Sequence, residues 1–164
     1  MVMYPPVKKP GIKIIKQHCK GCCVRHRYLM SVNTKRSFKL KSFKKINLYG
    51  KCKEIVLFLH IDNKVFNKKH LNLLIVNTRT KRVTRIDPSN SKSTKIEPSN
   101  VKKELKRYFT TLGYHYMGMD PRSKVIKHHS QCRFAAPYLY IYGKKLTSKK
   151  LDKLIKNFYK KNNV

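Results

Sequence analysis

Two apolar runs separated by a polar loop are the feature that most constrains the fold of this chain. The first covers residues 55–59, and the second, directly after His70, covers residues 71–76. Both are short, contain β-branched residues and are bounded by Asn and Asp, which favours strands over helices. A third run at 82–86 follows the turn residues 77–80. The sequence therefore predicts three strands, the last two joined as an antiparallel hairpin.

The predicted hairpin brings two chemically active side chains together. His70 stands at the start of its first strand, and Asp87 follows the end of its second strand, 17 residues later. Because the start of one arm faces the end of the other, the imidazole and the carboxylate can meet side by side. A histidine oriented by a carboxylate is part of a catalytic triad, and it requires a nucleophile. Each residue also has a structural interpretation, since a histidine can simply begin a strand and Asp-Pro-Ser-Asn is good turn chemistry.

The candidate nucleophile is Cys132, in the sequence Ser-Gln-Cys-Arg-Phe-Ala-Ala that begins at residue 130. A polar loop precedes it and an apolar segment follows, which predicts that a helix begins here. The free N–H groups of a helix start, together with a nearby imidazolium, stabilise a thiolate. We therefore expect the pKa of Cys132 to be depressed. The alternative is that Cys132 is a small core residue, as free cysteines often are.

The order of these residues carries a family resemblance. A strand, a histidine at the head of the next strand (His70), an aspartate closing the third (Asp87), a helix, and then a cysteine opening a helix (Cys132) resemble the adenovirus-protease and SUMO-protease superfamily of cysteine peptidases, including its forms in large DNA viruses. The likeness covers roughly residues 52–145. Three positions differ from the family pattern: Leu71 replaces a common Trp, Arg133 replaces Gly, and no Gln lies six or seven residues before Cys132.

The resemblance implies a fold and an activity. The fold would be α+β and papain-like, of the adenovirus-protease and SUMO-protease type, with a central antiparallel or mixed sheet packed by helices and the nucleophile at a helix N-terminus. The activity would be a cysteine endopeptidase that cleaves after small residues such as Gly in viral structural or ubiquitin-like proteins, within the host cytoplasm or nucleus and in the virion. Cys132 would attack, His70 would transfer the proton, and Asp87 would orient the imidazole. Gln131 is a candidate second donor to the oxyanion.

The charge of the chain predicts a polyanionic partner. Its 164 residues, enough for one domain, include 40 Lys and Arg against seven Asp and Glu, a formal net charge of +33. Nucleic acid fits such a surface, because binding releases the counterions of the phosphates. An anionic membrane fits less well, since no run of about eighteen apolar residues is present. With no basic cluster followed by an apolar segment at the amino end, the sequence predicts no signal peptide and an intracellular protein.

The amino-terminal part is the most basic. Residues 1–53 hold fifteen Lys and Arg and no acidic residue. We divide the chain into a basic N-terminal region, 1–51, and a protease-like α+β domain, 52–164, forming one compact unit. Prolines at 5, 6 and 10 predict an extended arm. Aromatic residues between the basic ones suit stacking on bases, or are core residues of half-buried strands. A nucleic-acid-binding or packaging protein without catalytic activity is therefore the alternative function, and nucleic acid is a possible activator of the peptidase.

Five cysteines in an intracellular chain predict thiols rather than disulfides. One group, Cys19, Cys22 and His26, with Cys52 or His18 as a fourth ligand, has part of a zinc pattern, which would suit a small zinc-binding regulator. Because a second CxxC or an HxxxH pair is missing, unligated thiols are favoured and no cofactor is required.

Helical and strand patterns fill the rest of the chain. We predict a helix over residues 101–112 that covers one face of the sheet, a strand at 114–119, a buried helix at 132–142 that contains Pro137, and a helix after the Thr147-Ser148 cap. Eight lysines from residue 144 onward cover the polar sides of the last helix, as a solvated face or a nucleic-acid contact. His128 and His129 are better placed to touch substrate or raise the positive field at Cys132 than to hold a metal.

Overall fold

The computed structural model describes residues 10–19, 22–34, 37–41, 48, 51–63, 68–88, 99–126 and 131–162. Its helices and strands follow in the order α1 (Pro10–His18), β1 (Cys22–Thr34), β2 (Ser37–Lys41), β3 (Glu54–Asn63), β4 (Lys68–Asn77), β5 (Arg82–Ile86), α2 (Ser99–Thr111), β6 (His115–Met119), α3 (Cys132–Tyr142), a 3-10 turn η3 (Gly143–Lys145) and α4 (Ser148–Lys161). The class is α+β, as predicted.

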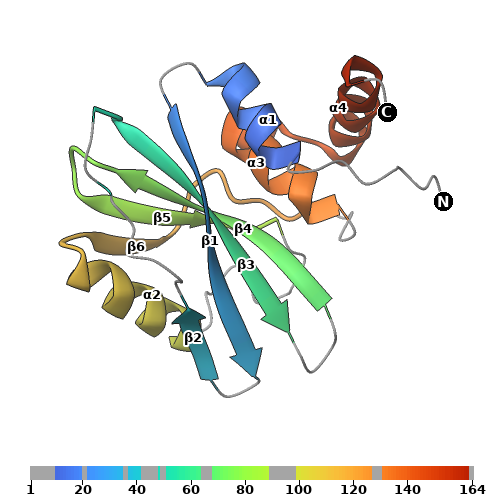
Figure 1. Cartoon of the computed structure of the whole chain (residues 1–164). Helices are drawn as coiled ribbons and strands as arrows, with labels where there is room; N and C mark the ends of the chain where they lie inside the picture. The colour runs from blue at the N-terminus through green and yellow to red at the C-terminus, as the bar shows by residue number, and fades with distance from the viewer. Residues whose placement is uncertain are drawn as a thin grey trace.

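The six strands form one mixed sheet in the order β2-β1-β3-β4-β5-β6 (Figure 1). The β3–β4 and β4–β5 pairs are antiparallel, while β1 runs parallel to β3 and β5 runs parallel to β6. The three strands predicted around the apolar runs are confirmed as β3, β4 and β5. Strand β1, from the basic N-terminal region, pairs directly with β3, so the two parts of the chain share one sheet.

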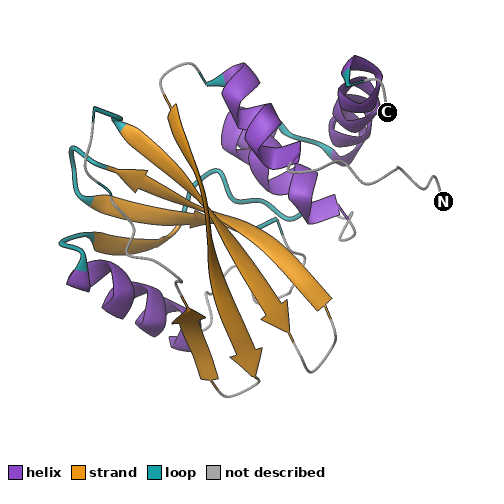
Figure 2. Ribbon diagram, viewed as in Figure 1, coloured by secondary structure: helices purple, strands orange, loops and turns teal. Residues whose placement is uncertain are grey.

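Helices cover both faces of the sheet (Figure 2). Helices α1, α3 and α4 lie on one side, where the core includes Val56, Leu73 and Leu139. Helix α2 covers the other side through Val101, Leu105 and Phe109, confirming the predicted amphipathic stripe. The two cores follow from the alternation of side chains along the central strands, because neighbouring residues of a strand point to opposite faces.

The predicted ends of α3 and the predicted start of α4 are confirmed, whereas α2 begins at Ser99, two residues before its predicted start. The hydroxyl of Thr147 accepts a hydrogen bond of 3.1 Å from the Lys150 N–H and so caps α4. Helix α2 is followed by Gly113 and α3 by Gly143, both with positive φ, the conformation that glycine adopts most easily. Pro137 lies within α3 and is buried.

Helix α1 was not predicted, and its first residue, Pro10, does not belong to an extended arm. Residues 1–9 lie outside the described part of the chain. Proline suits the first position of a helix, where the missing N–H would have no intrahelical partner. Gly11 then allows close packing, because a Cβ there would lie 2.8 Å from Phe58 Cε1 and 3.0 Å from Pro137 Cγ. The Pro-Gly sequence that resembles a turn therefore begins a helix pressed against β3 and α3.

A buried carboxylate ties β5 and β6 together. Asp120 is 6% exposed, and it accepts hydrogen bonds from Thr84 Oγ1 at 2.6 Å and from Arg122 Nε at 2.8 Å. Burial by itself would raise the pKa of Asp120, but the hydrogen bonds from Arg122 and Thr84 together hold that pKa below its usual value. The ionised form of Asp120 is therefore favoured by the folded state.

The hydrogen bonds of Asp120 with Arg122 and Thr84 predict that the free energy of unfolding depends on pH. The substitution Asp120→Asn should lower the free energy of unfolding by about 1–3 kcal/mol at pH 7. Since the pKa is depressed on folding, the stabilisation is present above the unfolded value of about 4 and is lost as the pH falls towards the folded value. Urea titrations of both proteins between neutral and acidic pH test this. A difference that stays constant down to the lowest pH would contradict it.

Candidate active site

Cys132 is the first residue of α3 and has a free thiol, as the sequence predicts for a helix start. The helix is fixed by buried residues that follow, among them Phe134, which packs edge-on against Phe158 of α4 at a centroid separation of 5.4 Å. The Cys132 side chain packs against the core cluster that includes Leu71 of β4. The start of α3 is therefore held directly against the strand that carries His70.

The expected depressed pKa of Cys132 is wrong. Burial of the thiol raises its pKa, and the negative charge of Asp87 raises it further, while the nearby main chains of Leu71 and Arg133 lower the pKa and only partly offset these effects. At this site a thiolate would lose more hydration energy than the partial positive charge at the helix N-terminus compensates. The thiol is consequently protonated at rest, and a base is needed to activate it.

Asp87 lies at the end of β5 within a buried polar network. Asn72 Nδ2 donates to Asp87 Oδ1 at 3.4 Å, and Arg85 Nη1 lies 3.9 Å from Asp87 Oδ2. The same Arg85 nitrogen donates to Asn72 Oδ1 at 3.1 Å. Arg85 and Asn72 are 3% and 1% exposed. The network fixes the carboxylate in place, and its charge reaches Cys132.

His70 is the third residue of β4, where it pairs with Ile61 of β3. Strand β5 ends at Ile86, opposite Leu73, so the beginning of β4 extends past it. Continuing the same register sets Asp87 opposite Asn72 and makes His70 its diagonal neighbour, a separation of about 7–8 Å between α-carbons that long side chains can bridge. Within the described residues no hydrogen bond joins the His70 ring to Asp87 or to Cys132.

The structure thus brings Cys132 close to Asp87 and against the core that contains Leu71. The alternation along β4 turns the His70 side chain to the opposite face of the sheet, the face of its partner Ile61, and among the described residues the imidazole is hydrogen-bonded to neither Cys132 nor Asp87. Gln131 directly precedes the helix and does not cap it. Its Oε1 is buried, and no described residue donates a hydrogen bond to it. The oxyanion role of Gln131 stays a prediction. His128 and His129 lie outside the described residues.

Asn72 and Arg85 are the functional candidates that sequence reasoning missed. Both signals are in the sequence: an asparagine interrupts the apolar run 71–76, and an arginine stands at 85 where the alternation of its strand leads towards the core. Buried polar groups need partners, so two such residues on adjacent strands point to a shared network. The pairing register was required to show that Asp87 completes it.

The thiol state expected for the remaining cysteines is wrong for two of them. Cys19 and Cys52 are disulfide-bonded, so neither provides a thiolate for the zinc pattern. Cys22 and His26 belong to β1, and their side chains lie outside the described part of the structure. Among the described residues, no group of three or more His, Cys, Asp or Glu is arranged to hold a metal ion.

Comparisons with known proteins leave the function to be argued from this geometry. No protein-family model matches the chain, and no curated protein sequence matches it. In the described segments, no helix has the length and apolar character needed to cross a membrane.

Proposed function

We propose that this protein is a cysteine endopeptidase in which Cys132, His70 and Asp87 act together. The observation that carries the proposal is the contact between α3 and β4: the Cys132 side chain at the start of the helix packs against the core cluster that includes Leu71, the neighbour of His70, and the charge of Asp87 raises the pKa of the thiol. Cys132, Asp87 and the main chain of His70 lie towards the same end of the sheet, with the His70 side chain on the face opposite Leu71. A papain-like arrangement of helix and sheet is consistent with this placement and is part of the proposal.

The raised pKa of the thiol determines the order of the chemical steps. Since Cys132 is protonated at rest, His70 removes its proton when a substrate fills the site and draws the groups together, as catalytic hydrogen bonds often tighten only in the complex. The sulfur attacks the scissile carbonyl, the C–N bond breaks, and His70 gives the proton to the leaving amine. A water molecule, deprotonated by His70, then hydrolyses the thioester, which releases the carboxylic acid product and returns the proton to Cys132. Asp87 stabilises the imidazolium. The Cys132 N–H, and Gln131 if its amide turns inward, donate to the oxyanion.

The substrates proposed are viral structural or ubiquitin-like proteins cut after small residues such as Gly, within an infected cell or its virions. Two disulfide-bonded cysteines favour a stage in an oxidising setting such as the virion over the reducing cytosol. Neither a metal nor an organic cofactor is needed for the chemistry described above.

Cleavage assays with Cys132→Ser test the proposal. Glycine-containing peptides and folded ubiquitin-like proteins are incubated with the natural protein and the variant, in the presence and absence of DNA. The natural protein should cleave, and the serine variant should lose activity by a factor on the order of 10⁴ or more, because a serine hydroxyl is not activated by the same base. Absence of cleavage by the natural protein under all these conditions contradicts the proposal.

A second candidate function is supported by the charge of +33. In this case the protein would bind or package nucleic acid through the same basic surface. It would contain Cys132 but would have no catalytic activity. This second function predicts that the natural protein and Cys132→Ser bind nucleic acid equally and that neither cleaves any substrate, DNA present or not.

A further inference from the structure

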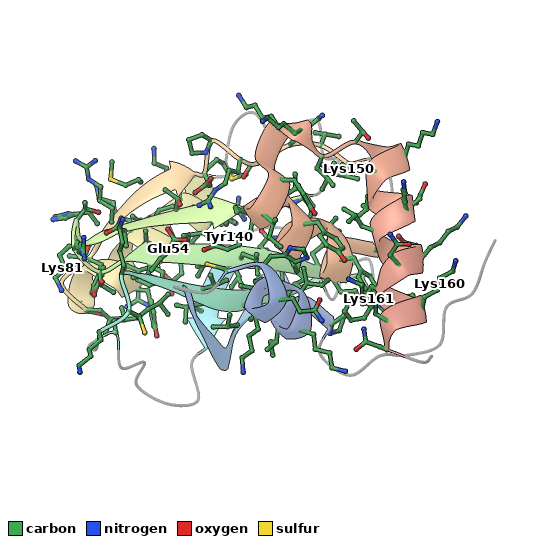
Figure 3. The ribbon with its side chains drawn as sticks, turned by 90° about the horizontal axis from the view of Figure 1, so that it is seen from above. Glu54, Lys81, Tyr140, Lys150, Lys160 and Lys161 are labelled. Atoms are coloured by element: carbon green, nitrogen blue, oxygen red, sulfur yellow. The ribbon has the colours of Figure 1, made fainter. Side chains whose placement is uncertain are left out.

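The outer face of α4 carries a row of exposed lysines. Its lysines at 149, 153, 156 and 160 are all exposed. Spacings of four, three and four residues set them in one stripe along the helix. At a rise of 1.5 Å per residue, the stripe extends about 16 Å. Figure 3 shows α4 at the outer edge of the molecule, with Lys150, Lys160 and Lys161 distributed along it.

The opposite face of α4 is already occupied. Leu151, Ile155 and Phe158 are buried in the core shared with α3. The helix therefore has no free apolar face to insert into a lipid bilayer, which an interfacial helix requires. Met117 and Val125, the large apolar residues that are exposed in the described part of the chain, lie outside α4.

Further basic groups extend the stripe. Lys144 and Lys145 of η3 are exposed just before the helix, and Lys161 is exposed at its last turn. Lys13 of α1 donates to Asn162 Oδ1 at 3.2 Å, which fixes the end of α4 beside a second lysine-bearing helix. Asp152 is the single acidic residue between 144 and 164. The resulting positive field has almost no compensation from its own segment.

We propose that this α4 face binds the phosphate backbone of nucleic acid, independently of base sequence. The composition and the second candidate function already suggest nucleic acid as a partner, and this inference rests on them and assigns the binding site to α4. The site includes neither Cys132 nor His70. A stripe of about 16 Å spans about five base-pair steps of duplex DNA at 3.4 Å each. Lysine ammonium groups suit this role, because they act as mobile point charges that follow a phosphate row without a fixed geometry.

Two triple variants with equal loss of charge test the assignment. The first is Lys149→Gln, Lys153→Gln and Lys156→Gln on α4; the matched control is Lys102→Gln, Lys103→Gln and Lys106→Gln, three exposed lysines of α2. Glutamine keeps a helix propensity close to that of lysine, so both variants should fold. Binding of a short DNA duplex of arbitrary sequence is measured over a range of salt concentrations.

The α4 variant should bind at least about tenfold more weakly at low salt, and its log–log salt slope should be shallower by about two to three, since each phosphate contact contributes about 0.9. The α2 variant should change little. Equal losses in both variants would show that net charge alone acts and would overturn the assignment, as would unchanged binding by the α4 variant. Because no cleavage is measured, failure here is distinct from failure of the peptidase proposal.

Discussion

Replacing His70 by alanine is expected to reduce kcat/KM for peptide cleavage by about a thousandfold or more. The thiol of Cys132 is protonated at rest because burial and the charge of Asp87 raise its pKa. If His70 is the base, as proposed, its removal leaves no group to take the proton during attack, and general bases contribute factors of about 10²–10⁴. Steady-state kinetics on a fluorogenic peptide ending in Gly measures the loss.

Two other histidines make this result specific. His115→Ala removes an exposed histidine from β6 and should leave kcat/KM unchanged. His60 pairs with Leu71 on the neighbouring strand, so its side chain points to the same face of the sheet as Leu71, the face that α3 covers. Loss of activity in His60→Ala with normal activity in His70→Ala would assign the base to His60 and contradict the account. Because His70 has no hydrogen bond to Asp87 or Cys132 in the described structure, His70→Ala should alter stability by less than about 1 kcal/mol.

The substitution Arg85→Leu is expected to lower the free energy of unfolding by about 3 kcal/mol or more. Arg85 is 3% exposed and lies between the oxygen of Asn72 and the carboxylate of Asp87. Without it, a buried amide oxygen loses its donor and a largely buried carboxylate loses its counter-charge, which is the costly way to break a buried ion pair. Urea unfolding of the purified variant at neutral pH measures the effect.

A matched variant and a rescue complete the test. Arg82→Leu removes an exposed arginine from the same strand and should cost about 0.5 kcal/mol or less. Adding Asp87→Asn to Arg85→Leu removes the uncompensated charge and should recover part of the lost stability, a coupling that a double-mutant cycle reports. If Arg85→Leu proves as mild as Arg82→Leu, the network does not hold Asp87 in the way described.

Much of the fold follows from local patterns in the sequence. The apolar runs of β3 and β4 and the stripes of α2 and α4 specify their own structure, because a strand or an amphipathic helix must bury one repeating set of side chains. Helix α1 was missed because its Pro10-Gly11 start resembles a turn, although proline also suits the first position of a helix and Gly11 packs closely against Phe58 and Pro137. The parallel pairing of β1 with β3 is equally non-local.

The candidate site likewise has some features that the sequence predicts and others that depend on the fold. The hairpin spacing of His70 and Asp87 and the helix start at Cys132 are sequence-level signals. The raised pKa of the thiol is not, because it depends on how deeply α3 buries the sulfur and on a carboxylate brought close by a different strand. The roles of Asn72 and Arg85 likewise depend on the β4–β5 register, which places them beside Asp87.

The most direct test of the central claim is covalent capture of Cys132 by a peptide electrophile that ends in a glycine vinyl sulfone. Mass spectrometry of the digested protein locates the adduct, and the time course gives its rate in the natural protein and in His70→Ala. The account predicts an adduct on Cys132, formed about a hundredfold or more faster in the natural protein than in His70→Ala. Equal rates in the two proteins, or equal rates before and after unfolding in urea, would contradict it.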